Sequence, residues 1–188
     1  MALSPIDRQI LLNHARLAMT TVIQGDRLPP IEIQQFSLPL QQLGASFVTL
    51  TSKAGALRGC IGAIDPYLPL VQDVREHAVA AATQDYRFPP VRPEELSQIK
   101  IEISILTPPQ ILLYDRPDDL LRLLKPKIDG VIMQDHQHRA TFLPQVWEKI
   151  PLPEEFLSHL CQKMGASPEL WRYKNMKIST YQVEEFHE

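Results

Sequence analysis

The fold class is decided by the stretch at residues 46–64, which reads Ser-Phe-Val-Thr-Leu-Thr-Ser-Lys-Ala-Gly-Ala-Leu-Arg-Gly-Cys-Ile-Gly-Ala-Ile. Strand-forming residues fill its first part, 46–51, and return at 57–64. The Lys-Ala-Gly run at 53–55 lies between them and is typical of a turn. The pattern therefore predicts a β-hairpin.

A second strand signal lies at 99–105, where isoleucine occupies every second position. Lys100, Glu102 and Ser104 stand between the isoleucines. This period of two is typical of a strand with one buried face, so we expect Lys100 and Glu102 to point outward.

Helices are predicted around these strands. The first helix begins after Ser4, which caps it while Pro5 takes the first helical position, and it ends near Gly25. We expect its buried stripe to consist of Ile6, Ile10, Leu17 and Val22. The other expected elements are a proline-broken loop over 26–43, a helix opened by Pro69 and ended by residues 86–90, a short helix at 118–124, a hairpin from 131–133 and 140–143, a helix at 154–164 and a strand at 177–183.

Hairpins and helices alternate without a strict strand–helix–strand repeat. The chain is therefore predicted to be α+β, with an antiparallel or mixed sheet flanked by helices. Its 188 residues are enough for one well-cored domain, and neither a linker nor an internal repeat divides them. We expect a single domain over 1–188.

Composition and charge exclude several classes of protein. The chain is 44% hydrophobic and carries 19 Lys and Arg against 22 Asp and Glu, a formal net charge of −3. A nucleic-acid-binding module usually has a basic excess, so nucleic acid is not an expected partner. No apolar run approaches the roughly 20 residues that span a bilayer, and no leader pattern opens the chain. We expect a cytoplasmic protein that does not bind membranes.

The segment Leu57–Gly62 holds the first candidate site. In a strand, Arg58 and Cys60 share a face with their Cα atoms roughly 7 Å apart, and a guanidinium beside a thiol favours the nucleophilic thiolate. Gly59 and Gly62 indicate a bulge, or close approach by a ligand or by other backbone. The alternative interpretation is structural: Cys60 is a small core residue, and the glycines let a helix pack closely.

Two further residues are candidates for binding. Glu102 can serve as a general base or a substrate anchor, and its alternative is a cross-strand ion pair. Arg87 can hold an anionic ligand, and its alternative is an ion pair with Asp85.

Metal and cofactor sites are not predicted. Asp135, His136 and His138 can form a metal corner, but their place between two apolar runs favours an exposed hairpin turn. The two cysteines, Cys60 and Cys161, lie far apart and form no metal-binding pair. No nucleotide-binding or hydrolase motif is present either.

Several segments, read in order, resemble the AMMECR domain family, in the archaeal and bacterial branch known as protein A of the AmmeMemoRadiSam system. The resemblance covers about 6–186. The segments that carry it are Phe47–Leu50, Leu57–Gly62, Arg87–Pro90, Ile101–Pro108, Asp129-Gly130, Leu143–Val146, Glu155–Leu157, Leu160-Cys161 with Lys163, and Trp171.

This resemblance implies an α+β fold with a larger and a smaller lobe, and functional association with a Memo-like protein and a radical SAM protein. It also implies that Leu57–Gly62 is the working site, without supplying a reaction. The chain departs from the family's usual glycine-rich turn at Gln134–His138, which speaks against a family-wide metal role there.

Three hypotheses follow, and they leave open whether the protein is an enzyme. The first is a component that binds a small anionic ligand, with Cys60 as nucleophile, Arg58 as the adjacent charge, and Glu102 or Arg87 as anchor. The second is a non-catalytic regulatory or adaptor module that docks its partners through the same strand. The third, nucleic-acid-linked regulation, is the least expected because of the net charge. An accessible, reactive Cys60 separates the first hypothesis from the second.

Overall fold

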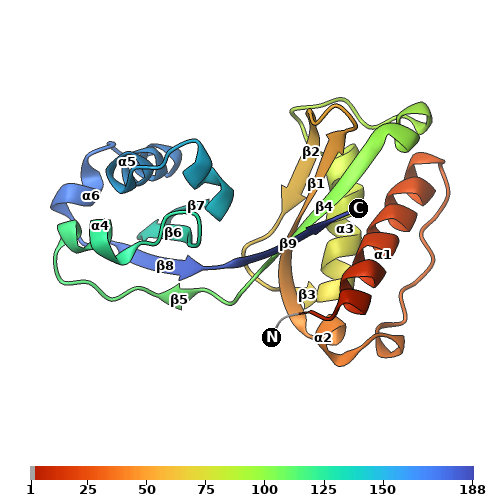
Figure 1. Cartoon of the computed structure of the whole chain (residues 1–188), viewed down its shortest axis with the longest axis horizontal. Coiled ribbons are helices and arrows are strands. Elements are labelled where there is room, and N and C mark those ends of the chain that lie inside the picture. The colour runs from red at the N-terminus through yellow and green to blue at the C-terminus, as the bar shows by residue number, and fades with distance from the viewer. Residues whose placement is uncertain (1–2) are drawn as a thin grey trace. The chain divides into compact units, whose positions relative to one another are not determined.

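The computed structural model describes residues 3–188, which form two compact units (Figure 1). The first unit holds the described residues up to Leu106 together with Glu184–Glu188, and the second unit holds Thr107–Val183. The units correspond to the larger and smaller lobes that the resemblance implies. A single domain over 1–188 stays a prediction.

The first unit combines two long helices with a five-stranded sheet. Its elements are α1 (Pro5–Ile23), a 3₁₀ turn (Ile33–Gln35), α2 (Leu38–Gln41), β1 (Leu43–Ser52), β2 (Leu57–Gly62), β3 (Leu68–Pro69), α3 (Leu70–Thr83), a 3₁₀ turn (Pro93–Gln98), β4 (Ile99–Leu106) and β9 (Val183–His187). The strand order is β2-β1-β4-β9, and β3 pairs with β1. The predicted hairpin is β1 and β2, which are antiparallel.

Helix α1 begins as predicted but buries a different stripe. Ser4 and Asp7 cap each other's backbone N–H groups in a capping box, with Pro5 in the first turn. Ile10 of the expected stripe packs against the core, but Ile6 and Leu17 are 72% and 60% exposed, so that part of the prediction was wrong. The residues that α1 buries are Asp7, Leu11, Leu12, Ala15, Ala18 and Met19. Several stripes fit a helical period, and packing against α3 selects this one.

Both long helices cover the same face of the sheet. The core cluster joins residues of α1 and α3 to the inward side chains of the strands, among them Val48, Leu50, Ile101 and Ile103. Lys100 is exposed and Glu102 is half-buried on the opposite face, as the alternation predicts. We call that opposite side, which carries Thr49, Cys60 and Glu102, the outer face.

The second unit has its own sheet and its own core. Its elements are β5 (Gln110–Ile111), a 3₁₀ turn (Pro117–Asp119), α4 (Leu120–Leu123), β6 (Gly130–Asp135), β7 (His138–Phe142), a 3₁₀ turn (Pro144–Glu148), α5 (Pro153–Lys163), α6 (Leu170–Tyr173) and β8 (Lys177–Tyr181). The strand order is β5-β8-β6-β7. At the centre of its core Trp147 stacks on Phe156, with ring centroids 3.6 Å apart.

The α+β prediction is confirmed. The loop expected over 26–43 is interrupted by α2, and a second correction lies near the C-terminus. The strand expected at 177–183 ends at Tyr181, and β9 begins at Val183 as a separate strand. β8 belongs to the sheet of the second unit, whereas β9 lies beside β4 in the sheet of the first. Within residues 3–188, no helix combines the length and the apolar character that crossing a bilayer requires.

Candidate functional site

The orientation of β2 follows from its glycines. A Cβ atom built on Gly59 would lie 2.1 Å from the backbone oxygen of Ala81, so this side of the strand faces α3. Because side chains alternate along a strand, Cys60 lies on the outer face. The β1–β2 register shifts at Arg58, between Leu57 and Gly59, so alternation does not place the Arg58 side chain. A Cβ atom on Gly62 would lie 2.4 Å from the ring of Phe47. Close packing of a helix and of an aromatic ring therefore accounts for both glycines.

Arg58 is engaged by the loop that follows α3 and by the turn after it. Its Nε and Nη2 atoms donate to the two carboxylate oxygens of Glu95, at 2.8 and 3.0 Å. Nη1 donates to the carbonyl oxygen of Pro89 at 2.7 Å. The hydrogen bond from Arg58 is the main reason that the pKa of Glu95 is lowered. The charge of Arg58 is thus directed at Glu95, and Arg58 holds the 89–95 segment against the motif strand.

Asp85 fastens the same loop to the backbone of Cys60. Its buried carboxylate accepts a hydrogen bond from the Cys60 N–H at 2.8 Å and two from the Arg87 guanidinium, at 2.6 and 2.9 Å. The Arg87 guanidinium also donates to the Cys60 carbonyl oxygen at 3.2 Å. The hydrogen bonds from Arg87 hold the pKa of Asp85 well below its usual range, against the effect of burial.

Arg87 forms the ion pair with Asp85 that the sequence offers as its alternative role, and this pair also acts on the edge of the sheet. Arg87 pairs with Asp85, and the pair satisfies both outward backbone groups of Cys60 on an edge strand. The unpaired N–H and C=O groups of an edge strand can pair with another chain. The Asp85–Arg87 pair, called the clasp below, protects this edge from such pairing. Arg87 nevertheless leaves 44% of its side chain exposed. Because the guanidinium donates to the carbonyl oxygen of Cys60, it lies close to the residue that carries the thiol.

The thiol of Cys60 is half-buried on the outer face. Its Sγ accepts a hydrogen bond from the Thr49 hydroxyl at 3.3 Å. Thr49 is the register partner of Cys60 on one side and of Glu102 on the other. The three side chains therefore form a row across β2, β1 and β4.

Glu102 continues this row toward β9. Burial and, secondarily, the charge of Glu185 raise the pKa of Glu102, while His187 opposes this shift. Its electrostatic neighbours, Glu185 and His187, lie on β9, the adjacent strand, and the cross-strand ion pair considered from the sequence stays a prediction. A carboxyl whose pKa is raised keeps a proton at higher pH than usual, which suits a group that gives and takes protons.

Sequence reasoning missed Thr49, Asp85, Glu95 and His187 as parts of this region. Thr49 could have been found, because it faces outward in the alternation of the hairpin. Asp85 was considered only as a partner of Arg87, and nothing in the sequence shows that it reaches the Cys60 backbone. His187 enters through β9, whose place in the sheet is a tertiary fact.

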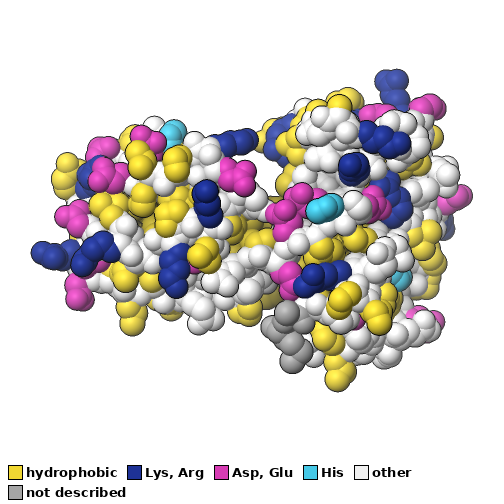
Figure 2. Space-filling model, in the orientation of Figure 1, with side chains coloured by type: hydrophobic (Ala, Val, Ile, Leu, Met, Phe, Trp, Pro, Cys, Tyr) yellow, Lys and Arg dark blue, Asp and Glu magenta, His cyan; other side chains and the backbone are white. Residues whose placement is uncertain are grey.

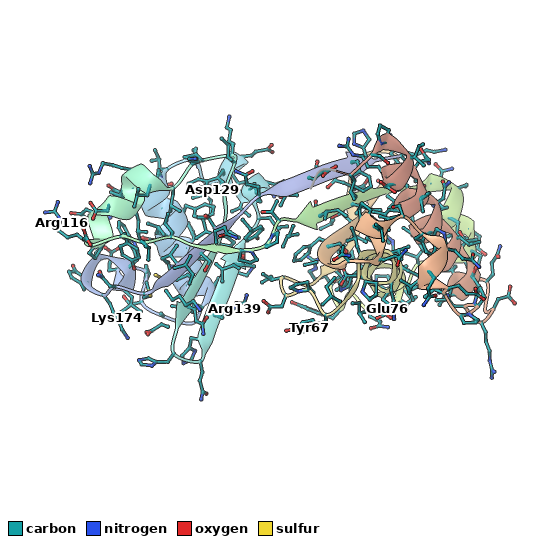
Figure 3. The ribbon with its side chains drawn as sticks, turned by 90° about the horizontal axis from the view of Figure 1, so that it is seen from below. Tyr67, Glu76, Arg116, Asp129, Arg139 and Lys174 are labelled. Atoms are coloured by element: carbon teal, nitrogen blue, oxygen red, sulfur yellow. The ribbon has the colours of Figure 1, made fainter. Side chains whose placement is uncertain are left out.

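The turn at 135–138 is the hairpin turn that the sequence favours. It joins β6 to β7, and His136 there has a left-handed backbone with φ of 51°. Lys174, labelled in Figure 3, binds Asp135 with a distance of 2.8 Å from Nζ to Oδ2. Nowhere in residues 3–188 do three or more His, Cys, Asp or Glu side chains gather in a way that could hold a metal ion.

Comparisons with known proteins cover both units. The profile of the family described as AMMECR1 matches residues 12–186. Protein MJ0810 of Methanocaldococcus jannaschii is 36% identical over 183 residues, which cover 94% of this chain and 88% of that protein. A protein of Methanothermobacter thermautotrophicus is 38% identical over 201 residues, which cover 100% of this chain and 99% of that protein. The crystal structure of the uncharacterized protein PH0010 from Pyrococcus horikoshii matches with a TM-score of 0.83 and 32% identity, over 95% of this chain and 89% of that one.

Proposed function

This chain belongs to the AMMECR1 family, and from its own residues we propose that the outer face around Cys60 binds a small anionic ligand, with the Cys60 thiol as nucleophile. One observation carries the proposal. A half-buried thiol accepts a hydrogen bond from Thr49 on the sheet face that the helices leave uncovered, beside a guanidinium that is 44% exposed.

The three groups have separate roles in this proposal. Arg87 supplies the charge that attracts an anion, because part of its guanidinium stays open while Asp85 fixes its position. Arg58, considered from the sequence for the charge beside the thiol, instead positions the loop that carries Arg87. Glu102 lies across Thr49 from the thiol and takes the role of acid or base.

Alkylation tests this proposal, with Cys161 as internal control. Cys161 is fully buried, and burial raises the pKa of its thiol, so it should stay unmodified in the folded protein. Iodoacetate and iodoacetamide both form a carbon–sulfur bond with Cys60, releasing iodide while the thiol proton passes to solvent. Only iodoacetate carries a negative charge, so the ratio of the two rates reports the charge beside the thiol and cancels changes in its exposure.

We expect Arg87→Gln to lower the iodoacetate-to-iodoacetamide ratio at Cys60 by about threefold or more, the effect of one nearby charge in water-like surroundings. Arg27→Gln removes the same charge at an exposed position of the same unit and should leave the ratio unchanged. An equal ratio in wild type and Arg87→Gln would exclude an anion site. A Cys60 as unreactive as Cys161 would exclude the thiol from chemistry.

A second function, docking of a partner, is favoured by exposed apolar side chains beside the same strand. Tyr86 is 95% exposed between Asp85 and Arg87, and Leu57 is 42% exposed at the start of β2. Exposed aromatic side chains are common anchors of protein interfaces. We propose a Memo-like protein and a radical SAM protein as the partners to test, in the cytoplasm, where two free cysteines would stay reduced.

Binding of each purified partner to the immobilised chain tests the docking function. Tyr86→Ala should weaken binding at least tenfold if Tyr86 is an anchor. Tyr173→Ala, at an 82% exposed tyrosine of the second unit, is the matched control. Equal binding by both variants would remove this surface from the interface.

On the side seen in Figure 2, acidic and basic side chains are interspersed, so that side offers no continuous basic surface for nucleic acid.

A further inference from the structure

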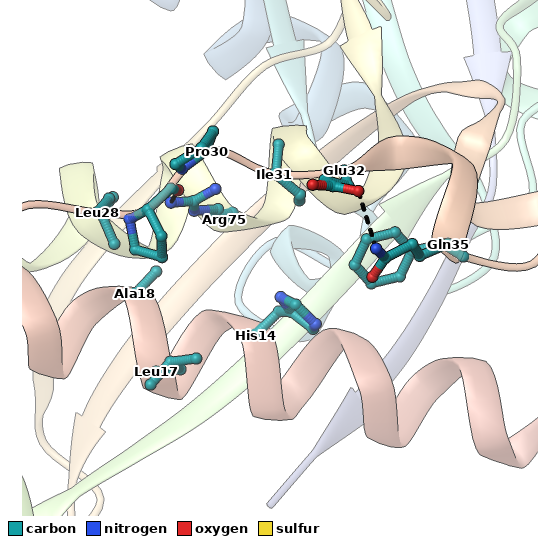
Figure 4. Close-up of a pocket in the computed structure, with 11 residues that line it drawn as sticks. His14, Leu17, Ala18, Leu28, Pro30, Ile31, Glu32, Gln35 and Arg75 are labelled. Atoms are coloured by element: carbon teal, nitrogen blue, oxygen red, sulfur yellow. Dashed lines mark hydrogen bonds between the residues drawn. The ribbon is translucent and has the colours of Figure 1, made fainter.

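A cavity of about 300 Å³ lies between α1, α3 and the segment 28–36 (Figure 4). This segment belongs to the proline-broken loop expected over 26–43, for which no chemistry is predicted from the sequence. Figure 4 shows His14, Leu17 and Ala18 on the α1 side of the space and Leu28, Pro30 and Ile31 on the other. Since α1 and α3 cover the inner face of the sheet, the cavity lies on the opposite side of the sheet from Cys60.

Most of the cavity wall is apolar and stiff. Leu17 and Ile31 supply aliphatic surface, and Pro29 and Pro30 fix the backbone of the loop. The Phe36 ring meets the His14 imidazole edge to face, with centroids 4.9 Å apart and planes at 73°. Leu17, which is 60% exposed and lies outside the core stripe of α1, gains a role as part of this wall.

Four polar side chains line the same space, and only Arg75 among them carries a positive charge at neutral pH. Arg75 donates one hydrogen bond to the Pro29 carbonyl oxygen, and a guanidinium has further N–H groups to offer. Burial and the charge of Arg75 lower the pKa of His14, so its imidazole is neutral at neutral pH. The carboxylate of Glu32 accepts a hydrogen bond from Gln35 at 2.9 Å.

We propose that this cavity binds a small organic acid, with its single carboxylate on Arg75 and an aromatic or branched apolar body against Leu17 and Ile31. A mostly apolar pocket with a few convergent polar groups is the usual form of a small-molecule site. A guanidinium prefers the planar carboxylate, which it binds through paired N–H donors.

The charges of the cavity exclude the nearest alternatives. Arg75 offers one positive charge, and Glu32 places a negative charge on the same wall. Glu32 repels any anion, but it repels a phosphate ester with two charges about twice as strongly as a single carboxylate, and Arg75 repels an organic cation. A singly charged acid fits both conditions. This site is independent of the thiol site proposed above.

Phenylacetate and its neutral analogue 2-phenylethanol test the proposal, because both carry the same ring and only the first carries a carboxylate. Titration followed by amide chemical shifts should give a millimolar dissociation constant for phenylacetate, as expected for a ligand of this size. The shifts should concentrate at α1 and residues 28–36. Phenylacetate should bind about tenfold more tightly than 2-phenylethanol, the effect of a charged hydrogen bond.

Two variants separate the role of the charge from the role of the fold. Arg75→Gln should abolish the preference for phenylacetate while 2-phenylethanol still binds, whereas the control Arg27→Gln should keep the wild-type preference. Leu17→Asp, at an exposed position that tolerates substitution, should weaken both ligands. The proposal is overturned if neither ligand shifts these residues, if wild type shows no preference, or if Arg75→Gln loses both ligands equally, which would make Arg75 only a support of the loop.

Discussion

Replacing Gly59 by alanine tests whether this glycine is needed for packing or for a ligand. The new Cβ atom would lie 2.1 Å from the Ala81 carbonyl oxygen, whereas ordinary contacts begin at 3.4 Å. Strand and helix would have to separate by about 1 Å, and α3 cannot yield easily because the opposing atom is backbone. Overpacking of this kind lowers the free energy of unfolding by about 1–3 kcal/mol, and we expect Gly59→Ala to lower it by about 3 kcal/mol.

Urea unfolding at pH 7 measures this loss, with Gly55→Ala as the matched control. Gly55→Ala adds the same methyl group at a position with no atom within 4 Å of it. Only the left-handed φ of 84° at Gly55 opposes a side chain, and we expect it to lower stability by about 1 kcal/mol. Amide shifts of Gly59→Ala should concentrate around Ala81. The packing argument is refuted if Gly59→Ala loses no more stability than Gly55→Ala. If stability is kept while alkylation of Cys60 changes, Gly59 serves a ligand instead.

Two further predictions concern the clasp and the cysteines. Asp85→Asn should lose about 2–3 kcal/mol at pH 7, because a charged acceptor of several buried hydrogen bonds becomes neutral. Since the folded-state pKa of Asp85 is lowered, its stabilisation is present above the unfolded pKa of about 3.9 and is lost below it. The gap between wild type and Asp85→Asn should therefore narrow in urea titrations as the pH falls below about 4, and a constant gap would contradict the role of the charge. Cys161→Ser should lose about 1–3 kcal/mol of stability, because it places a hydroxyl at a fully buried position. Cys60→Ser should lose less than about 1 kcal/mol, because Thr49 can still donate a hydrogen bond to the serine oxygen. Equal losses in thermal or urea unfolding would contradict the different burial of the two thiols.

The strands and the helix starts could be predicted because their signals are local. The isoleucine alternation at 99–105 and the cap at Ser4 each depend only on residues that are close together in the sequence. The buried face of α1 could not be predicted, because Ile6 and Leu17 fit a helical period as well as Leu11 and Ala15 do. Only the position of α3 decides between these stripes.

The candidate site was harder to predict than the fold, for a related reason. The sequence predicts Arg58 and Cys60 on one face, but it shows neither the register shift at Arg58 nor the pairing of its guanidinium with Glu95, 37 positions later. In the same way, Asp85 reaches the Cys60 backbone across 25 positions, and His187 joins the row only because β9 returns to the first sheet. The segment 28–36, which forms one wall of the cavity, left no periodic signal, because it is mostly loop.

The residues around β2 divide into those that hold the strand in place and Cys60, for which thiol chemistry is proposed. Gly59 lets α3 pack closely on β2, and Arg58 binds the 89–95 segment. Arg87 and Asp85 hydrogen-bond the backbone of Cys60 at the edge of β2. Loss of function after changing any of these would therefore report damage to the fold as readily as damage to chemistry. Cys60→Ser differs from them, because it exchanges one atom on the outer face and leaves the backbone clasp in place. A defect in Cys60→Ser at unchanged stability would thus be evidence for thiol chemistry that no other substitution in this motif can supply.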